Sequence, residues 1–260
     1  MDAFGESIFG QMKGKRTMGV MVVTGASAGI GRAVAEIALA QGWQVACLAR
    51  RLDVLQDVVA AGDGLAIACD VTDAAEVASA FAQVVARFGR IDVLFNNAGL
   101  FPKAALPDEV ALEDWNACMA VNLTGMFLCA RAAFGQMRTQ DPQGGRIINN
   151  GSISGQVPRP RAMAYTVSKH AINGMTKQLA LDGRPFNIAA GQIDVGNTRT
   201  ELAAQMEKGV MQADGSIQPE AMMEVAEVAN AVMHMAALPQ GANVLNMTVM
   251  ATAMPFVGRG

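Results

Sequence analysis

The stretch VMVVTGASAGIG, residues 20–31, decides the fold class of this 260-residue chain. Residues 20–24 form a compact apolar run that ends at a glycine, which is typical of a buried parallel strand. A helical spacing of apolar residues follows from 30 to 40. Glycines at 25, 29 and 31 permit a tight turn and a close approach of backbone to a ligand. Since the first N–H groups of a helix suit a diphosphate, the stretch predicts a dinucleotide-binding unit; the alternative is an ordinary strand–helix turn.

The same alternation of short β-rich runs and longer helical patterns continues along the chain. Strands are predicted at residues 20–24, 44–49, 65–69, 91–95, 146–150, 187–191 and 244–249. Helices are predicted at residues 30–40, 53–61, 74–88, 113–137, 162–181 and 224–237. Because parallel strands need crossover connections, this order predicts an α/β fold, a Rossmann-type doubly wound parallel sheet of about seven strands flanked by helices. We expect one domain, residues 18–260, preceded by an N-terminal arm, residues 1–17.

Composition and charge argue against several classes of partner. Hydrophobic residues make up 52% and charged residues 17% of the chain, which suits a large core rather than disorder. The net charge of -3 comes without a basic block, so neither nucleic acid nor an anionic membrane is expected as a partner. Four cysteines without a CxxC pair and two histidines predict buried free thiols and no metal site. Since no apolar stretch approaches the ~20 residues that cross a bilayer, we expect a cytoplasmic protein.

The end of the second predicted strand carries two arginines. An acidic residue there would bind the ribose 2′-hydroxyl of NAD, whereas arginine accommodates the 2′-phosphate of NADP. The strand ends LARR, residues 48–51, and no carboxylate follows before Asp53. This favours NADP(H) over NAD(H), with Arg50 as the main phosphate ligand and Arg51 as a secondary one. In the alternative, both arginines only solvate the next helix; Ala28 also lacks the basic side chain that would have strengthened the prediction.

Tyr165 and Lys169 stand four residues apart in a helical pattern, so they project from the same face. A phenol with a pKa of about 10 is a poor acid–base group at neutral pH, and a nearby ammonium lowers that pKa. Alone, the two would be an ordinary surface pair. However, Ser152 ends the fifth predicted strand, and ligands bind at the carboxyl ends of strands in open α/β sheets. Four more candidates fall at such ends: Gly25, Arg50, Asp70 and Asn97.

With these positions in view, the sequence resembles the short-chain dehydrogenase/reductase family. The matching motifs are TGASAGIG (24–31), CDV (69–71), NNAG (96–99), Asn122, Ser152 and YTVSK (165–169). The resemblance implies an NAD(P)-dependent oxidoreductase that interconverts a carbonyl and an alcohol. Its implied catalytic residues are Asn122, Ser152, Tyr165 and Lys169. Its implied cofactor-binding residues are Gly25, Ser27, Ala28, Gly29, Ile30, Gly31, Arg50, Arg51, Asp70, Val71, Asn97, Ala98, Gly99, Tyr165, Lys169, Ile193 and Val195.

The same resemblance implies a division of roles within the catalytic set. Tyr165 would transfer the proton, and Ser152 would hydrogen-bond the substrate oxygen. Lys169 would bind the nicotinamide ribose and lower the pKa of Tyr165. Asn122 would hold a water molecule in the proton relay.

The segment after the sixth predicted strand departs from the family pattern of Pro-Gly, an aliphatic residue and then threonine. We read Ala190 in place of the proline and Val195 in place of the threonine, with Thr198 as a substitute hydroxyl. Ile193 would still offer backbone groups to the nicotinamide carboxamide. The C-terminal residues 246–260 also lack the usual Asp-Gly-Gly ending.

Residues 197–223 are predicted to form the substrate lid, because a long segment follows the sixth strand here. Its methionines favour a medium-sized apolar or aromatic carbonyl substrate, unless they only form helix core. Arg159 and Arg161, near the mouth of the site, would suit an anionic substrate or else lie solvated in a loop.

The segment 118–137 is apolar on several faces, and the family pairs this helix with a second copy. We therefore expect a homodimer or homotetramer.

Two other functions stay open on the same fold: a non-catalytic nucleotide-sensing regulatory protein, and a dehydratase or epimerase that keeps the cofactor. The intact catalytic set argues against the first. The short chain argues against the second, because it leaves little room for a separate substrate domain.

Overall fold

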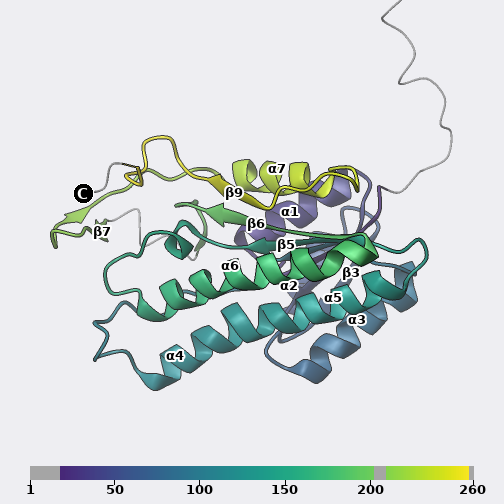
Figure 1. The fold of residues 1–260 in the computed structure, drawn as a ribbon, viewed down its shortest axis with the longest axis horizontal. Coiled ribbons are helices and arrows are strands. Elements are labelled where there is room, and N and C mark those ends of the chain that lie inside the picture. Colours follow the sequence, from purple (N-terminus) through teal and green to yellow (C-terminus); the bar gives the residue numbers. More distant parts are fainter. Residues whose placement is uncertain (1–17, 202–208, 258–260) are drawn as a thin grey trace, which may run out of the picture.

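The computed structural model describes residues 18–201 and 209–257, so the predicted N-terminal arm and part of the predicted lid lie outside the described residues. A seven-stranded sheet has the order β3-β2-β1-β4-β5-β6-β9, and every neighbouring pair in it is parallel. The predicted Rossmann-type fold is therefore confirmed (Figure 1). The order of the strands reverses between β1 and β4, which is where open α/β sheets bind their ligands.

The observed elements follow the predicted alternation. The strands of the large sheet are β1 (Val20–Thr24), β2 (Gln44–Ala49), β3 (Gly64–Ala68), β4 (Val93–Asn96), β5 (Gly145–Asn150), β6 (Ile188–Val195) and β9 (Asn246–Val249). The helices are α1 (Gly29–Ala40), α2 (Leu52–Val59), α3 (Ala74–Phe88), α4 (Leu112–Met119), α5 (Met126–Thr139), α6 (Met163–Gly183) and α7 (Val225–Ala236). Short helical turns cover Ile153–Gly155 and Arg184–Phe186.

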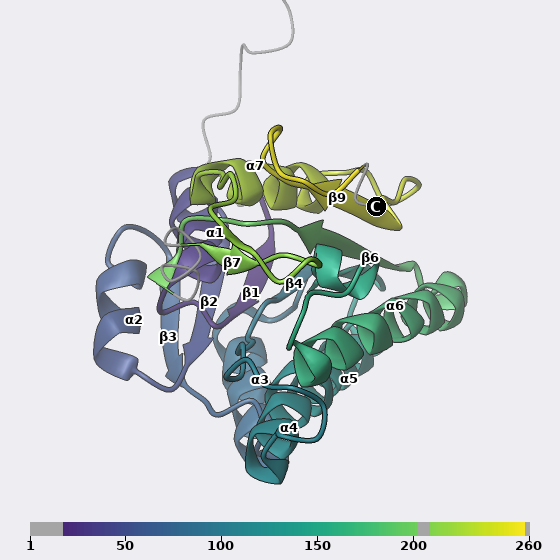
Figure 2. The same ribbon diagram turned by 90° about the vertical axis from the view of Figure 1, so that its left-hand side faces the viewer.

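Helices cover both faces of the sheet (Figures 1 and 2). Helices α1, α2 and α7 pack on one face, where Val34, Leu55 and Val232 are fully or almost fully buried. Helices α3 and α5 pack on the other, around Phe81 and Ala133, and α6 lies beside them. Both faces of the strands are thus apolar, which explains why the run at residues 20–24 is hydrophobic at every position.

The long helix predicted at residues 113–137 is interrupted. It runs as α4, a π-helical turn at Ala120–Gly125 and then α5. By length and composition alone, Leu112–Thr139 could cross a bilayer, because it has 28 residues and contains an 18-residue window with a mean hydropathy of 1.4. The sequence-based expectation that no stretch approaches this length was therefore wrong. In the fold this helix packs against α3, α6 and the sheet, which accounts for much of its apolar surface.

The sixth strand is the clearest error of the sequence prediction. It was placed at residues 187–191, yet β6 runs from Ile188 to Val195. The polar residues Gln192 and Asp194 are not typical of a buried parallel strand, but both are buried and hydrogen-bond to each other and to side chains from other elements. The lid region also contains a small antiparallel hairpin, β7 (Val210–Met211) and β8 (Ile217–Gln218), which the sequence did not predict.

Candidate active site

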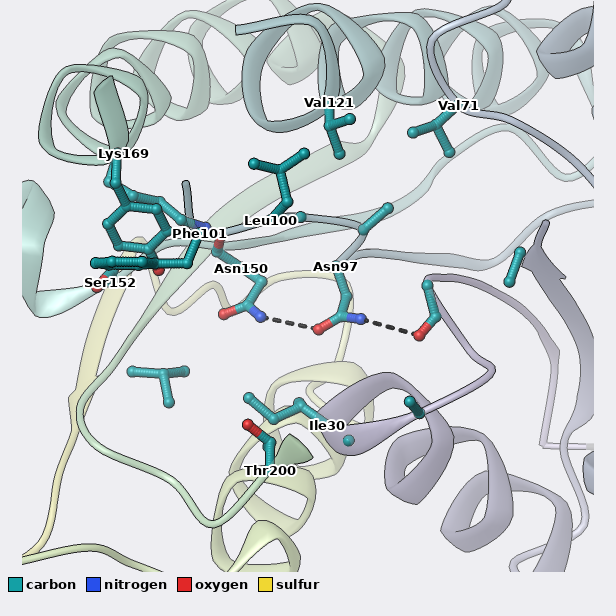
Figure 3. Close-up of a pocket in the computed structure, with 18 of the residues that line it drawn as sticks. Ile30, Val71, Asn97, Leu100, Phe101, Val121, Asn150, Ser152, Lys169 and Thr200 are labelled. Atoms are coloured by element: carbon teal, nitrogen blue, oxygen red, sulfur yellow. Dashed lines mark hydrogen bonds between the residues drawn. The ribbon is translucent and has the colours of Figure 1, made fainter. Parts of the chain in front are cut away.

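One cavity of about 1180 Å³ lies along the carboxyl ends of the strands. The glycine turn lines one end of it and Ser152, Tyr165 and Lys169 line the other (Figure 3). Of the predicted site residues, the structure brings these together around the cavity: Gly25, Ser27, Ala28, Gly29, Ile30, Arg50, Arg51, Asp70, Val71, Asn97, Ala98, Gly99, Ser152, Tyr165, Lys169 and Val195. Gly31, Asn122 and Ile193 are not part of the cavity lining.

The glycine turn is shaped by backbone. Gly25 and Gly29 have φ angles of +66° and +53°, a region that side chains rarely adopt. A Cβ on Gly31 would lie 2.4 Å from the carbonyl oxygen of Gly25, so this glycine lets helix α1 pack against the turn although it does not line the cavity. Ala28 caps α1 without a side-chain hydrogen bond, which leaves the first N–H groups of the helix available to an anion. These features fit a diphosphate.

Asn97 links the two ends of the cavity. The hydroxyl oxygen of Thr24 accepts hydrogen bonds from the backbone N–H groups of Asn97 and Ala98, at 2.8 and 3.0 Å. The side-chain amide of Asn97 donates to the carbonyl of Thr24 at 2.9 Å. It accepts from the amide of Asn150 at 2.8 Å, a hydrogen bond that Figure 3 shows. The ends of β1, β4 and β5 are therefore held together by this asparagine.

Arg50 and Arg51 are exposed and line the cavity beside the glycine turn. A guanidinium nitrogen of Arg51 donates to the hydroxyl of Ser27 at 3.2 Å. Asp53 is not among the cavity-lining residues. Asp70 does line it, and its pKa is lowered, chiefly by hydrogen bonds from Thr72 and also by the charge of Arg50. This end of the cavity thus combines free helical N–H groups with two cations.

The catalytic end is built on the start of α6. The ammonium of Lys169 is buried, donates to the carbonyl of Asn150 at 2.7 Å and lies 5.5 Å from the ring centroid of Tyr165. Burial lowers the pKa of Lys169 to about 8, against the opposing charge of Asp194. Burial also raises the pKa of Tyr165, and hydrogen bonding with Ser152 only partly offsets this rise. The sequence led us to expect a lowered pKa for Tyr165; burial reverses that expectation and keeps the phenol protonated.

Asn122 lies in the π-helical turn and behind the cavity. Its amide oxygen accepts from the N–H of Leu100 at 2.8 Å, and its amide nitrogen donates to the carbonyl of the same residue at 2.9 Å. Its nitrogen also contacts the hydroxyl of Ser168 at 3.2 Å. Asn122 therefore holds the chain after β4 against α6, and its predicted role in a proton relay stays a prediction.

The segment at the end of β6 corrects our alignment with the family pattern. Ala190 lies within the strand, and the pair that leaves the strand is Val195-Gly196. Ile193 is fully buried in the core and is not part of the cavity lining, and its carbonyl accepts from the N–H of Gly151 at 2.8 Å, so its predicted contact with the carboxamide has no support in this geometry. The hydroxyl of Thr198 donates to the carbonyl of Gly196 at 3.1 Å.

Sequence reasoning missed several residues that line the cavity. Thr200 is one, and its side chain lies 3.2 Å from where a Cβ on Gly29 would be (Figure 3). Phe101 is another, with its ring centroid 4.6 Å from that of Tyr165. Leu100 and Asn150 also belong to the wall. Three of these four lie within two residues of a motif residue, which is the signal that could have found them: Leu100 and Phe101 follow the NNAG motif, and Asn150 ends β5 two residues before Ser152.

Arg159 also lines the cavity, but its positive charge is paired with a carboxylate. It forms an ion pair with Glu220 at 2.7 Å, and the two side chains are only 10% and 2% exposed. The same guanidinium donates to Asn197 at 2.9 Å. Arg159 therefore ties the lid segment to the site, whereas Arg161 is exposed and outside the cavity lining.

Comparisons with known proteins agree with this geometry. A family model described as short chain dehydrogenase matches residues 19–210. A 3beta-hydroxysteroid dehydrogenase of Mediterraneibacter gnavus is 36% identical over 204 residues, which cover 76% of this chain and 71% of that protein. A 2,5-dichloro-2,5-cyclohexadiene-1,4-diol dehydrogenase of Sphingobium indicum is 35% identical over 202 residues, 76% of this chain and 78% of that protein.

A solved structure of actinorhodin polyketide ketoreductase with NADPH superposes with a TM-score of 0.81 at 27% identity, covering 92% of this chain and 98% of that chain. The chain is thus similar to two proteins named as alcohol dehydrogenases of cyclic compounds and to a ketoreductase whose structure was solved with NADPH. With the family model covering most of its length, this chain belongs to the short-chain dehydrogenase/reductase family.

Proposed function

We propose that this enzyme is an NADP(H)-preferring oxidoreductase that interconverts a ketone or aldehyde and the corresponding alcohol in the cytoplasm. The observation that carries the proposal is that one continuous cavity has the predicted phosphate-binding residues at one end and the predicted catalytic residues at the other. Arg50 and Arg51 lie by the glycine turn, and Ser152, Tyr165 and Lys169 lie at the far end. One extended dinucleotide could therefore place its ribose phosphate at the first end and its reactive ring at the second.

The residues of the chain divide the chemistry between them. The glycine turn and the N-terminus of α1 would bind the diphosphate, and the cofactor would supply or accept the hydride. The hydroxyls of Ser152 and Tyr165 would donate hydrogen bonds to the carbonyl oxygen, on which negative charge develops. Tyr165, held protonated by burial, would deliver the proton, and Lys169 would stabilise the phenolate that remains. In the oxidation direction the same groups would act in reverse.

The walls around Tyr165 favour an apolar substrate. Leu100 and Phe101 line this part of the cavity, and the ring of Phe101 lies against that of Tyr165. Arg159 is neutralised by Glu220, so it offers little to an anionic substrate. The relatives above are named for steroid and cyclohexadiene alcohols. We therefore propose a medium-sized apolar carbonyl compound or alcohol, including alicyclic ones, as the substrate.

Turnover of Tyr165→Phe tests the activity. We expect the wild type to oxidise NADPH with members of a ketone and aldehyde panel, and Tyr165→Phe to reduce kcat by on the order of 10³-fold, because the proton donor is lost. NADPH affinity, measured by fluorescence titration, should change little in the variant. Undiminished turnover in Tyr165→Phe would refute the mechanism, and unchanged nucleotide binding without any wild-type turnover would favour a nucleotide-sensing role instead.

Arg50→Ala tests the cofactor preference. We expect its affinity for NADPH to fall about tenfold and its affinity for NADH to stay within about twofold, since only NADPH carries the 2′-phosphate. Arg87→Ala is the matched control, because Arg87 is an exposed arginine paired with Asp63 outside the cavity. Equal losses for both nucleotides in Arg50→Ala, or tighter binding of NADH by the wild type, would contradict the preference.

We also propose that the enzyme is a homodimer or homotetramer that pairs through the long helix and α6. Both elements expose large apolar side chains: Phe127, Met163 and Val167 are 50%, 41% and 38% exposed. Mass from light scattering behind size-exclusion chromatography checks the assembly. Phe127→Glu should lower the mass, and a monomeric wild type would contradict the proposal.

A further inference from the structure

Strand β6 carries a buried carboxylate that the mechanism above does not use. Asp194 has no exposed surface, although it lies one residue before the strand ends. Four hydrogen bonds satisfy its two oxygens. Oδ1 accepts from the backbone N–H of Ser152 at 3.1 Å and from the amide of Gln192 at 2.6 Å. Oδ2 accepts from the amides of Gln156 at 2.7 Å and Asn246 at 3.0 Å.

The carboxylate lies directly against the backbone that presents Ser152. A Cβ on Gly151 would lie 2.1 Å from Oδ1 of Asp194, so the space a side chain would need at that position is filled by the carboxylate. The backbone N–H of Ser152 is buried and donates to Oδ1 of Asp194. A buried N–H without a partner is costly, so this hydrogen bond fixes how the Gly151–Ser152 backbone leaves β5.

Asp194 also ends a chain of buried polar groups that crosses the sheet. The amide of Asn96 on β4 donates to Asn149 on β5 at 3.3 Å, and Asn149 donates to the hydroxyl of Thr176 at 3.0 Å. Thr176 donates to Gln192 at 3.1 Å, and Gln192 donates to Asp194. Such a fully satisfied network is rigid and allows one arrangement of its members.

The charge of Asp194 also acts electrostatically on the ammonium of Lys169. Among the residues that the structure describes, no ion pair includes Asp194, so its charge is balanced at longer range. It raises the pKa of Lys169 and thereby favours the ammonium, opposing the effect of burial. Arg159 and Cys118 also act on the pair formed by Tyr165 and Lys169: Arg159 lowers the pKa of Tyr165, and Cys118 raises both pKa values.

We propose that Asp194 is a positioning residue of the active site, which fixes the Gly151–Ser152 backbone through its hydrogen bond and supplies the negative charge opposite Lys169. The inference rests on the proposed reductase function, because Ser152 and Lys169 matter through that chemistry. Asp194 itself does not line the cavity. It therefore acts through the catalytic residues and not on the substrate.

Asp194→Asn removes the charge and keeps the shape. The variant retains an oxygen for the N–H of Ser152, and the amides of Gln156 and Asn246 can rotate to accept from its new N–H₂ group. We expect kcat for ketone reduction to fall at least tenfold while KM for NADPH stays within about twofold. The alkaline limb of the pH profile of kcat should move to lower pH, because the ammonium of Lys169 loses its opposing charge.

Asp92→Asn is the matched control. Asp92 precedes β4 at the amino-terminal ends of the strands, accepts from the N–H of Val20 at 2.8 Å and pairs with Arg90. Its loss should reduce thermal stability and leave both kcat and the pH profile unchanged. If Asp194→Asn gives the kcat and pH profile of the wild type, the positioning role is refuted.

Two further measurements keep the inference testable if that variant does not fold or if no substrate is found. The double variant Gln156→Leu/Asn246→Ala changes two exposed residues and removes both donors to Oδ2 of Asp194. We expect kcat to fall at least threefold. An unchanged kcat would count against the positioning role of Asp194. The pKa of Lys169, read from heteronuclear NMR of lysine side chains, needs no turnover. This pKa should be lower in Asp194→Asn than in the wild type. Equal pKa values would refute the electrostatic role of Asp194. A wild type without turnover would refute only the proposed function.

Discussion

The two ends of the cavity are built on different principles. At the glycine end, the backbone forms the site: positive φ angles at Gly25 and Gly29, a Gly31 with no room for a Cβ, and uncapped N–H groups of α1. At the catalytic end, buried polar side chains form it, and they come from β4, β5, α6 and β6. The glycine end depends on the absence of side chains from the glycines of one short stretch of sequence. The catalytic end depends on partners that lie far apart in the sequence.

This difference predicts different responses to substitution. A change at the glycine end should act on nucleotide affinity, since backbone shape is what the diphosphate contacts. A change at the catalytic end should act on kcat and on the pH dependence, since charges and hydrogen bonds within a dry network are altered there. Three experiments separate the two responses, in decreasing order of expected effect.

Gly31→Ala should have the largest combined effect on folding stability and nucleotide binding. The new Cβ would lie 2.4 Å from the carbonyl oxygen of Gly25 and 2.5 Å from the amide of Asn97, so the turn or the helix must shift. We expect a loss of about 1–3 kcal/mol in the free energy of unfolding and at least tenfold weaker NADPH binding. Gly135→Ala is the control in α5, where a Cβ meets nothing within 4 Å and helix propensity should stabilise the protein slightly. If Gly31→Ala binds NADPH as tightly as the wild type, the backbone shape of the glycine turn does not determine nucleotide affinity.

Lys169→Met should inactivate the enzyme and yet stabilise it. The pKa of Lys169 is about 8 in the folded protein and 10.5 when unperturbed, so folding must bury a charge at neutral pH. We expect a gain on the order of 1–3 kcal/mol at pH 7. Between about pH 8 and 10.5 the unfolded wild type binds more protons than the folded one, so wild-type stability rises with pH and the advantage of the variant shrinks. Urea unfolding at pH 7 and pH 9.5 checks this; a variant that is less stable at both values would show that the ammonium is well solvated.

A pair of threonine variants should have the smallest effect and compare the two ends directly. Thr24→Val removes the acceptor of two N–H groups at the glycine end, and Thr176→Val removes one link of the network at the catalytic end. Each should cost about 1–2 kcal/mol, because buried polar groups lose a partner. Thr24→Val should weaken NADPH binding, whereas Thr176→Val should lower kcat. Thr139→Val, at an exposed helix end, is the control and should stay within about 0.5 kcal/mol of the wild type in unfolding experiments. A reversal of the two effects would overturn the comparison.

The accuracy of the sequence prediction follows the same division. Helix α3 was predicted to the residue, since Asp73 caps it with its side chain and Gly89 ends it in a left-handed conformation. Strand β1 and the glycine turn were also predicted, because their signals are local. Strand β6 was predicted to end four residues too early, and this error displaced Ile193 and Ala190 from their true places. Polar residues in a buried strand look like a loop until their distant partners are known.

The sequence by itself determined the alternation of strands and helices, the glycine turn and the family motifs, because each depends on residues that are close neighbours in the chain. Only the tertiary structure decided the state of the catalytic groups. It buried Tyr165 so that its pKa rises, paired Arg159 with Glu220, and placed the carboxylate of Asp194 under Ser152. The physical reason is that burial and charge act through space, between residues that the order of the chain does not bring together.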